Sequence, residues 1–440
     1  MNTLKSWLCA AALCCGATAA AAVPGELDAT FGSGGISRQY YGDLAQADDL
    51  VVDRLGNVYT AGTSTTAGTA VPLLTKYKPD GTLDGSFGSG GFATPAAPPP
   101  NLALYSAVTI FRDTLYQLVA ADDKLYVYAF DTNGAAQAWF GSGGVAVFTV
   151  GNAIYPVFDI AQWGNYLGIA ASAMNPATGN HDFVLVQLTL GGAPVAGFGS
   201  GGIAYSRLWS GAGARNRLTG LTFQADGRIV AAGRASKPGA QYDFVAARYR
   251  LSGAPDPTFG LGGFSTLDFG GQDFGRRVSL RKDGSLVLAG SVCKELDPAA
   301  GTLYCLAAAT AFKADGSLDT GFGASGRFIQ DVGGGGVTVT DLVLDERERP
   351  ILVGQHLARP LSGSDPAASY ALIMRLRRTG WLDGSYLGGG WADFSYGYES
   401  SANGGVQRYP GGLVVTAGNS MKPVGPATLA GPTTAARHSN

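Results

Sequence analysis

The chain has 440 residues, which is long for a single compact core, and 46% of them are hydrophobic while only 15% are charged. A typical globular domain carries about 25% charged residues, so this surface is under-charged. Lys and Arg number 31 against 33 Asp and Glu, and a chain without a basic excess is poorly suited to bind nucleic acid. The 67 glycines follow no collagen-like period, which favours many short strands joined by tight turns.

The N-terminus predicts a signal peptide over residues 1–22. Lys5 supplies a positive charge, residues 8–15 are apolar, and residues 16–22 are small and offer several cleavage sites. The apolar run is too short to cross a bilayer, and no later segment has transmembrane length. A lipoprotein signal is the weaker alternative, because Leu13 precedes Cys14 where a small residue is expected. We therefore expect a secreted or periplasmic protein without membrane insertion.

A Phe-Gly-Ser-Gly-Gly sequence, called here the Phe-Gly signature, recurs along the rest of the chain. It begins at Phe31, Phe87, Phe140, Phe198, Phe259 and Phe322, with drift in the last two, and a degenerate copy begins at Tyr386. The copies are about 53 to 64 residues apart, which is the spacing of β-propeller blades. The Phe is expected to be an apolar knob between blades, and the glycines to let the backbone cross closely.

Each repeat also contains strand-forming segments around a tight turn. Residues 221–223 and 229–233 flank Asp226-Gly227, and residues 278–280 and 286–290 flank Asp283-Gly284. Asp-Gly between apolar β-formers predicts a hairpin, because its turn needs positive φ. A third strand (244–249) and a fourth after the glycines (202–205) complete a four-stranded blade. We predict an all-β propeller of seven such blades over residues 23–420, with six or eight as alternatives.

The two ends of the repeat region complement each other. Residues 25–28 begin inside a repeat, whereas residues 406–415 form a hairpin with no clear signature after it. A ring closed by N- and C-terminal strands in one blade would hide both sheet edges. Residues 421–440 are rich in Pro, Ala and Thr and predict a mobile tail, or alternatively the missing strand of the last blade.

These residues resemble the delta-60 repeat family of bacterial proteins. Its pattern is similar to G-x-L-D-x-x-F-G-x-G-G, then a hairpin around D-G-[KR]-[IL], then a strand like F-x-[LV]-A-R-Y. Residues 225–230 and 243–249 match it closely, whereas residues 111–114 and 162–165 replace the Asp-Gly turn in two copies. The resemblance covers nearly the whole predicted mature chain. It implies a propeller fold and export, and it carries no assigned catalytic residues.

Cys293 and Cys305 remain after removal of the predicted signal peptide. They lie in two strand-like stretches separated by a short loop. Neighbouring antiparallel strands can bring such residues to disulfide distance, and export makes oxidation plausible. We expect a disulfide, with two unpaired core thiols as the alternative.

Motifs for cofactor, metal or catalytic chemistry are weak in this sequence. His181, His356 and His438 are the only histidines, too few for the metal site that Gly179-Asn180-His181-Asp182 suggests. The Phe-Gly signatures lack the Lys-Ser/Thr of a phosphate loop, and the Asp-Gly turns lack a calcium ligand ladder. We therefore predict no catalytic residue, no cofactor and no metal.

Arginine pairs occupy corresponding places in two successive repeats. Arg215 and Arg217 precede the first strand of one repeat, and Arg276 and Arg277 hold the same place in the next. If the first strands are innermost, these four residues cluster at one mouth of the central channel and favour carboxylate or phosphate ligands. A solvated surface is the alternative.

Two functions remain open from the sequence. The first is an exported, non-catalytic binding or scaffold protein that uses its loop faces, with an extracellular protein or an anionic glycan as the expected partner. The alternative is an exported hydrolase or lyase at the channel mouth. That enzyme would need buried, pKa-perturbed carboxylates in one channel pocket, for which Asp48, Asp49 and Asp341 are the candidates.

Overall fold

The computed structural model describes residues 25–42, 44–151, 154–155, 158–175, 177–211, 213–297, 302–358, 368–395, 399–401, 406–409, 413–424, 428–430 and 433–438. All regular structure within these ranges is β-strand. No helix there could cross a membrane. The predicted signal peptide, residues 1–22, lies outside the described residues.

Four sheets contain four antiparallel strands each, paired in chain order. They comprise β2 (Leu44–Val52), β3 (Val58–Thr66), β4 (Thr69–Tyr77) and β5 (Phe92–Ala93); β6 (Leu102–Phe111), β7 (Thr114–Ala121), β8 (Lys124–Asp131) and β9 (Val145–Thr149); β18 (Gln272–Leu280), β19 (Leu286–Asp297), β20 (Thr302–Phe312) and β21 (Arg327–Gln330); and β22 (Gly336–Leu344), β23 (Pro350–Ala358), β24 (Ala368–Arg375) and β25 (Trp391–Phe394).

An eight-stranded sheet holds two further repeats. It comprises β10 (Asp159–Trp163), β11 (Tyr166–Met174), β12 (His181–Thr189) and β13 (Ile203–Ser206), followed by β14 (Arg215–Phe223), β15 (Ile229–Ser236), β16 (Asp243–Tyr249) and β17 (Phe264–Leu267). The two halves are joined by one parallel pair, His181 with Arg215. Because these repeats share a sheet, the hydrogen-bond pairing does not support the predicted count of seven separate four-stranded blades.

The remaining sheet joins the two ends of the chain. It contains β1 (Ile36–Gln39), β26 (Glu399–Ser401), β27 (Val406–Tyr409), β28 (Leu413–Val424), β29 (Thr428–Ala430) and β30 (Thr433–His438). β30 pairs with both β28 and β1. Residues 421–440, for which the sequence allowed a mobile tail or a lent strand, thus include a strand of the closing sheet.

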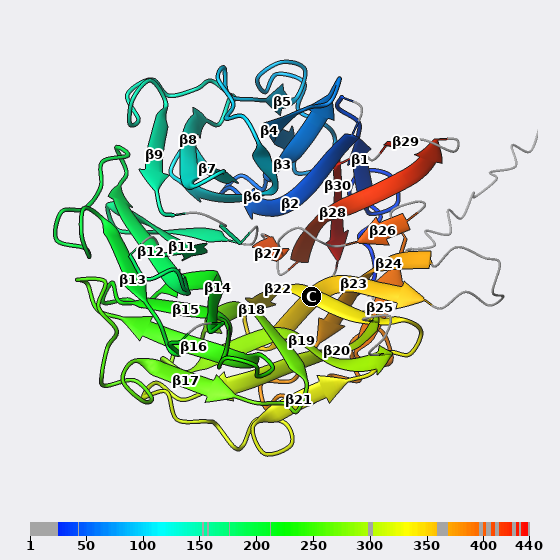
Figure 1. The fold of residues 1–440 in the computed structure, drawn as a ribbon. Coiled ribbons are helices and arrows are strands. Elements are labelled where there is room, and N and C mark those ends of the chain that lie inside the picture. The colour runs from blue at the N-terminus through cyan, green and yellow to red at the C-terminus, as the bar shows by residue number, and fades with distance from the viewer. Residues whose placement is uncertain are drawn as a thin grey trace, which may run out of the picture.

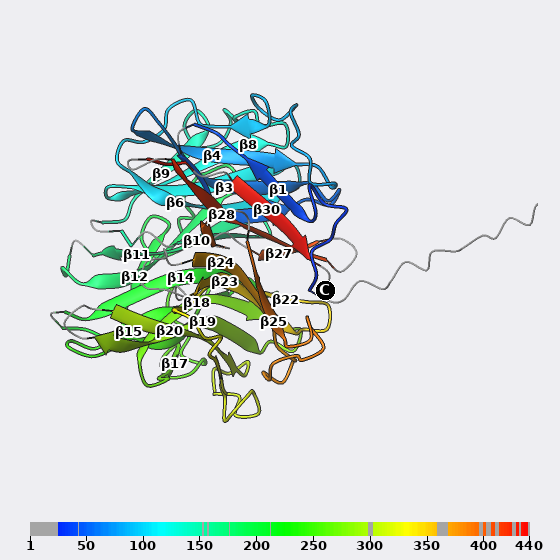
Figure 2. The same ribbon diagram turned by 90° about the vertical axis from the view of Figure 1, so that its right-hand side faces the viewer.

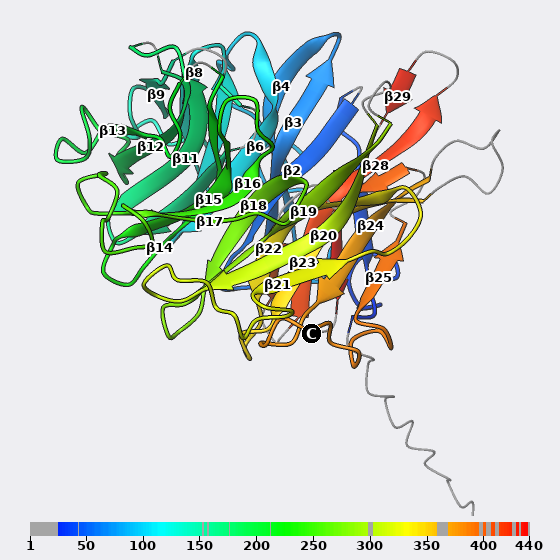
Figure 3. The same cartoon turned by 60° about the horizontal axis from the view of Figure 1, so that its bottom comes forward.

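The sheets follow one another around a ring in chain order, which confirms the predicted all-β propeller (Figure 1). The side views show β1 and β30 side by side in the sheet that closes the ring (Figure 2), and the sheets fanned face to face (Figure 3). A closed ring leaves no long sheet edge open for pairing with other chains.

The hydrophobic core lies between consecutive sheets. Phe87 packs with Tyr59 of its own repeat and with Leu115 and Val119 of the next one. All seven signature aromatic side chains are buried: Phe31, Phe87, Phe140, Phe198, Phe259, Phe322 and Tyr386. The predicted role of the Phe as an apolar knob between repeats is therefore confirmed.

Backbone contacts also join each signature to the next repeat. The N–H of Gly88 donates to the carbonyl of Asn133 at 2.7 Å, and that of Gly260 donates to Asp315 at 2.8 Å. The turn glycine that follows, Gly134 or Gly316, has positive φ, and a Cβ there would lie 2.5 to 2.6 Å from the signature backbone. Only glycine permits this approach without displacing the neighbouring repeat.

The charged residues of the repeat motif form buried ion pairs. Arg248 of β16 contacts Asp256 at 2.8 Å, and Arg375 of β24 contacts Asp383 at 2.9 Å. Each pair links a third strand to the Leu-Asp or Pro-Asp segment that precedes the Phe-Gly signature. The arginine of the motif is thus part of the scaffold in these repeats.

Candidate functional site

The first strands of six successive repeats line a common cavity of about 990 Å³ at the centre of the ring. Its wall includes Asp49 of β2, Asp159 of β10, Arg277 of β18 and Asp341 of β22. The first strands are therefore the channel-lining strands, which is the condition for the predicted clustering of the arginine pairs.

Arg277 links carboxylates from two other repeats across this cavity. Its Nη1 lies 2.8 Å from Oδ2 of Asp159, and its Nε lies 3.1 Å from Oδ1 of Asp341. Nη1 also donates to the carbonyl of Thr219 at 3.1 Å, and Nη2 donates to Oη of Tyr105 at 3.4 Å. The guanidinium group thus contacts residues of four other first strands, β6, β10, β14 and β22.

A glycine makes room for the Arg277 side chain. Asp49, Gly220, Arg277 and Asp341 each follow the register shift of their first strand. A Cβ at Gly220 would lie 2.8 Å from the carbonyl oxygen of Arg276 and 3.1 Å from Cδ of Arg277. Because Gly220 has no side chain, the Arg277 side chain can extend past β14 and reach Asp159 of β10.

The cavity carboxylates also accept backbone hydrogen bonds. Asp49 accepts the N–H groups of Leu50 and of Val108 in the next repeat, both at 2.8 Å. Asp159 accepts those of Ile160 and of Leu221 in the next repeat, both at 2.9 Å. These carboxylates therefore fasten adjacent first strands to each other.

Burial shifts the pKa values of this region strongly. It raises the pKa of Asp48 to about 8, despite hydrogen bonds from Gln46 and Ser106, and the nearby Asp49 adds to the rise. It also raises the pKa of Asp49 to about 8, although Arg277 opposes the shift. For Arg277, burial alone would lower the pKa, but Asp159, Tyr105, Asp341 and Asp49 raise it well above the ordinary value. Of the carboxylates expected for an enzyme, Asp49 and Asp341 line the cavity, whereas Asp48 does not.

Three other arginines surround Tyr155 near the N-terminal ends of β14 and β18. The guanidinium of Arg217 lies 4.2 Å from the Tyr155 ring centroid, and that of Arg234 lies 5.0 Å from it. Arg234 also lies 4.4 Å from the Phe274 ring and donates to Oη of Tyr155 at 2.6 Å. Arg276 lines the same pocket of about 210 Å³ as Arg234, Tyr155 and Phe274. We call Arg217, Arg234 and Arg276 the arginine cluster.

The arginine cluster has no carboxylate within ion-pair distance in the part of the chain that the structure describes. The Nε atom of each member is buried without a hydrogen-bond partner there. Burial lowers the pKa of Arg234 to about 10, and the neighbouring Arg276 and Arg217 add to the fall while Tyr155 opposes it. Burial would raise the pKa of Tyr155, but the three guanidinium groups lower it overall.

The four predicted arginines do not form one group. Arg217 and Arg276 meet in the arginine cluster, whereas Arg277 is committed to the cavity carboxylates. Arg215 is exposed on β14, where it pairs in register with His181. Arg234 and Tyr155 were missed because they come from a second strand and from a connecting segment, and neither lies in a repeated motif.

The predicted disulfide between Cys293 and Cys305 is confirmed. The two residues are directly paired across β19 and β20. Both line the pocket that also contains Arg234 and Arg276. The disulfide therefore forms part of the wall beside the arginine cluster.

Residues 56–87 and 224–259 match a family model described as a domain of unknown function (DUF5122) beta-propeller. The two segments lie in two different repeats, and they support a bacterial β-propeller repeat family. No curated protein matches the chain.

Several solved structures are similar to this chain. A protein of unknown function from Dyadobacter fermentans DSM 18053 is 14% identical, with a TM-score of 0.43, 78% of this chain covered and 98% of that one. Sqt1 from Chaetomium thermophilum is 12% identical, with a TM-score of 0.47 and coverage of 90% and 88%. An exo-1,5-alpha-L-arabinanase from a bovine ruminal metagenomic library is 9% identical, with a TM-score of 0.33 and coverage of 68% and 97%.

Proposed function

We propose that the protein is an exported, non-catalytic binding protein that holds an anionic group of its ligand at the arginine cluster. The observation that carries the proposal is three guanidinium groups packed around Tyr155 with no carboxylate partner among the described residues. Clustered guanidinium groups favour carboxylate, sulfate or phosphate, which accept their paired hydrogen bonds. Burial strengthens such contacts because the local dielectric is low.

The size of the pocket narrows the kind of ligand. Its volume of about 210 Å³ is below the roughly 300 to 1,000 Å³ of sites that enclose a whole small molecule. Arg217 and Arg276 are partly exposed, so a charged substituent can reach them from solvent. One sulfate or carboxylate group of a larger molecule fits these limits. An anionic glycan outside the cytoplasm is therefore the ligand class that we favour.

The second candidate is an exported hydrolase or lyase that uses the central cavity. The observation in its favour is Asp49, which lines the cavity and whose pKa burial raises to about 8, as it does for the adjacent Asp48. Against it, Asp49 already accepts two backbone N–H groups, and Asp159 and Asp341 contact Arg277. Groups committed in this way favour a structural role over general acid–base catalysis, which requires access to substrate.

The finer architecture is part of the proposal. We count seven repeats, because the halves of the eight-stranded sheet meet at a single pair and β1 completes the closing sheet. The two matched segments and the repeat motif fit the delta-60 repeat family. Export is supported by the disulfide, since disulfides persist mainly in oxidising compartments.

The test is a binding screen of the purified mature protein on an array of neutral, carboxylated and sulfated glycans. We expect binding to the charged glycans alone, weakening with salt because charge contacts are screened. Arg234→Gln and Arg276→Gln should each reduce binding about tenfold or more, which corresponds to the loss of one charge-assisted hydrogen bond. Arg215→Gln is the matched control and should bind normally.

Three results would overturn the proposal. Equal binding of neutral and sulfated glycans would show that the ligand need not be anionic. Unchanged binding by Arg234→Gln and Arg276→Gln would show that the arginine cluster is not the binding site. Turnover of any arrayed glycan would show that the protein is an enzyme and not a non-catalytic binding protein. In that case Asp49→Asn should abolish turnover if the central cavity is the active site, because Asp49 lines its wall.

A further inference from the structure

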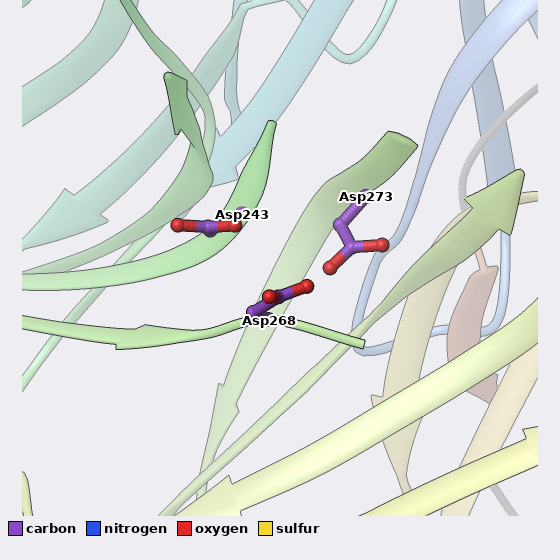
Figure 4. Close-up of side chains that lie close together, drawn as sticks. All are labelled: Asp243, Asp268 and Asp273. Atoms are coloured by element: carbon purple, nitrogen blue, oxygen red, sulfur yellow. The ribbon is translucent and has the colours of Figure 1, made fainter. Parts of the chain in front are cut away.

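Three carboxylates converge where the repeat of β14 to β17 meets the repeat that begins with β18. Asp243 lies at the start of β16, Asp268 directly follows β17, and Asp273 lies in β18. One carboxylate oxygen from each lies within 4.8 Å of the others. Figure 4 shows the carboxylates of Asp268 and Asp273 facing each other, with Asp243 close by. The three ligand atoms thus come from three separate elements.

Asp273 is buried with an oxygen that has no partner. Its exposed fraction is 0%, and its Oδ1 has no hydrogen-bond partner among the described residues. Oδ2 accepts the N–H of Phe269 at 2.6 Å. Burial raises the pKa of Asp273 to about 7, and the nearby carboxylates of Asp268 and Asp243 add to the rise. A buried carboxylate oxygen without a donor costs free energy unless a proton or a cation is bound to it.

The preceding junction in the ring provides an internal comparison. There, Asp182 of β12 lies 2.8 Å from Nη2 of Arg207, which directly follows β13. Asn216 of β14 lies beside them, and its Oδ1 accepts the N–H groups of Leu208 and Trp209, both at 3.0 Å. The negative charge at this junction is therefore balanced by an arginine.

The strand registers show that these are the same positions in two repeats. Phe183 pairs with Ser206 in one repeat and Phe244 pairs with Leu267 in the next, so the residues after the fourth strands, Arg207 and Asp268, correspond. By the same pairs, Asp182 corresponds to Asp243. Asn216 and Asp273 each lie two residues before the register shift of their first strand.

Two changes therefore distinguish the second junction from the first: an arginine becomes Asp268, and an amide becomes Asp273. The junction loses one positive charge and gains two negative ones. Lys237 is the cation that acts on Asp243, but its Nζ lies over the Trp209 ring at 4.4 Å from the centroid. No ion pair to any of the three aspartates occurs within the described ranges.

We propose that Asp243, Asp268 and Asp273 form a binding site for a divalent cation of the calcium type. Calcium prefers oxygen ligands at about 2.3 to 2.6 Å, so ligand atoms separated by up to 4.8 Å can contact one ion. The ion takes the place that the Arg207 guanidinium holds at the preceding junction. Water completes the coordination on the solvent side, where Asp268 is exposed.

The site joins two repeats of the ring. Asp243 and Asp268 belong to one repeat, whereas Asp273 belongs to the first strand of the next. A bound ion therefore fastens the outer strands of one repeat to the channel-lining strand of its neighbour. This role is independent of the arginine cluster and of whether the protein binds a glycan.

The test measures calcium binding by the mature protein after treatment with EDTA. Titration calorimetry with CaCl2 should give one ion per chain, with a Kd on the order of 10⁻⁴ to 10⁻³ M, as in extracellular calcium modules. Saturating calcium should also raise the melting temperature by about 1–3 °C. Asp268→Arg recreates the arginine of the preceding junction, so it should abolish calcium binding while melting in EDTA at or above the temperature of the wild type.

Asp331→Arg is the matched control, because Asp331 directly follows β21 in the next repeat and should leave calcium binding unchanged. Asp243→Asn, at a partly exposed residue, provides a second variant if Asp268→Arg does not fold, and it should weaken binding at least tenfold. The proposal is wrong if the wild type binds no calcium, or if calcium binds equally well to Asp268→Arg and Asp243→Asn.

Discussion

Arg276 and Arg277 are adjacent in the chain, yet their guanidinium groups lie in opposite electrostatic environments. Arg277 contacts Asp159 and Asp341 and lies near Asp49, so its charge is balanced by acidic groups. Arg276 instead lies near Arg234 and Tyr155, with further positive charge around it. The comparison shows that the place of an arginine in a repeat does not decide its role. An arginine paired with carboxylates is structural, whereas one without such partners is a candidate for ligand binding.

The largest effect that would test this contrast is expected at Arg277. Arg277→Met should lower the free energy of unfolding by about 3–5 kcal/mol, because it leaves buried carboxylates without their cation. Urea-induced unfolding measures the change. Lys282→Met, at an exposed residue of the same cavity, is the control and should cost less than about 0.5 kcal/mol. A loss below about 1 kcal/mol for Arg277→Met would mean that the carboxylates are stable without it.

The disulfide should have the next largest effect. Replacing Cys293 and Cys305 together by serine should lower the free energy of unfolding by about 2–3 kcal/mol, because it frees a short loop in the unfolded chain. Unfolding of the wild type in the presence of a reductant should give a similar loss. If the disulfide also shapes the neighbouring pocket, the double variant will bind anionic glycans more weakly than the wild type at a temperature where both are folded.

The raised pKa values of Asp48 and Asp49 predict how stability depends on pH. A carboxyl group whose folded pKa is about 8 and whose unfolded pKa is near 3.8 stabilises the fold below pH 4, and this contribution is lost as the pH rises toward 8. Asp48→Asn keeps a neutral group at one such position. It should flatten the fall in stability between pH 4 and 8 and raise the free energy of unfolding at pH 8 by about 1 kcal/mol or more. An unchanged pH profile would show that Asp48 titrates normally.

The smallest effect on stability is expected in the arginine cluster. Arg234→Met should change the free energy of unfolding by less than about 1 kcal/mol, because it removes a buried charge that its neighbours repel while retaining side-chain volume. Sulfate should raise the melting temperature of the wild type more than that of the variant. A cost as large as that of Arg277→Met would show that the contacts of Arg234 with Tyr155 and Phe274 stabilise the fold as much as the ion pairs of Arg277 do, and the contrast between the two regions would be lost.

Much of the fold was predictable because its signals are local and repeated. The Phe-Gly signature predicts a buried aromatic residue and a close backbone crossing, and both occur, for example at Phe87 and between Gly88 and Gly134. Asp-Gly turns predict hairpins such as that of β14 and β15. Sheet membership was less predictable, because one pair, His181 with Arg215, merges two repeats into a single hydrogen-bonded sheet.

The candidate site was predictable only in part, because it depends on contacts between distant residues. Asp49 and Asp341 do line the cavity, because both lie on channel-lining strands, whereas Asp48 is buried next to Asp49 and is not part of the cavity wall. The separation of Arg277 from Arg276 depends on which side of the strand each side chain takes after the register shift at Gly275. Likewise, the sequence did not predict the group of Asp243, Asp268 and Asp273, because Asp268 and Asp273 become close to Asp243 only through strand pairing and the packing of one repeat on the next.

The pairing of β1 with β30 has a consequence for how the molecule reaches its native state. These strands are far apart in the sequence, so the loop that their contact closes is very long and the contact must await synthesis of β30. Earlier repeats can stack on one another beforehand, but the ring of sheets stays open until β1 pairs with β30. A circular permutant in which a linker joins the end of β30 to the start of β1, with new termini in a surface loop of another sheet, would make the β1–β30 pairing local. This pairing should then form faster.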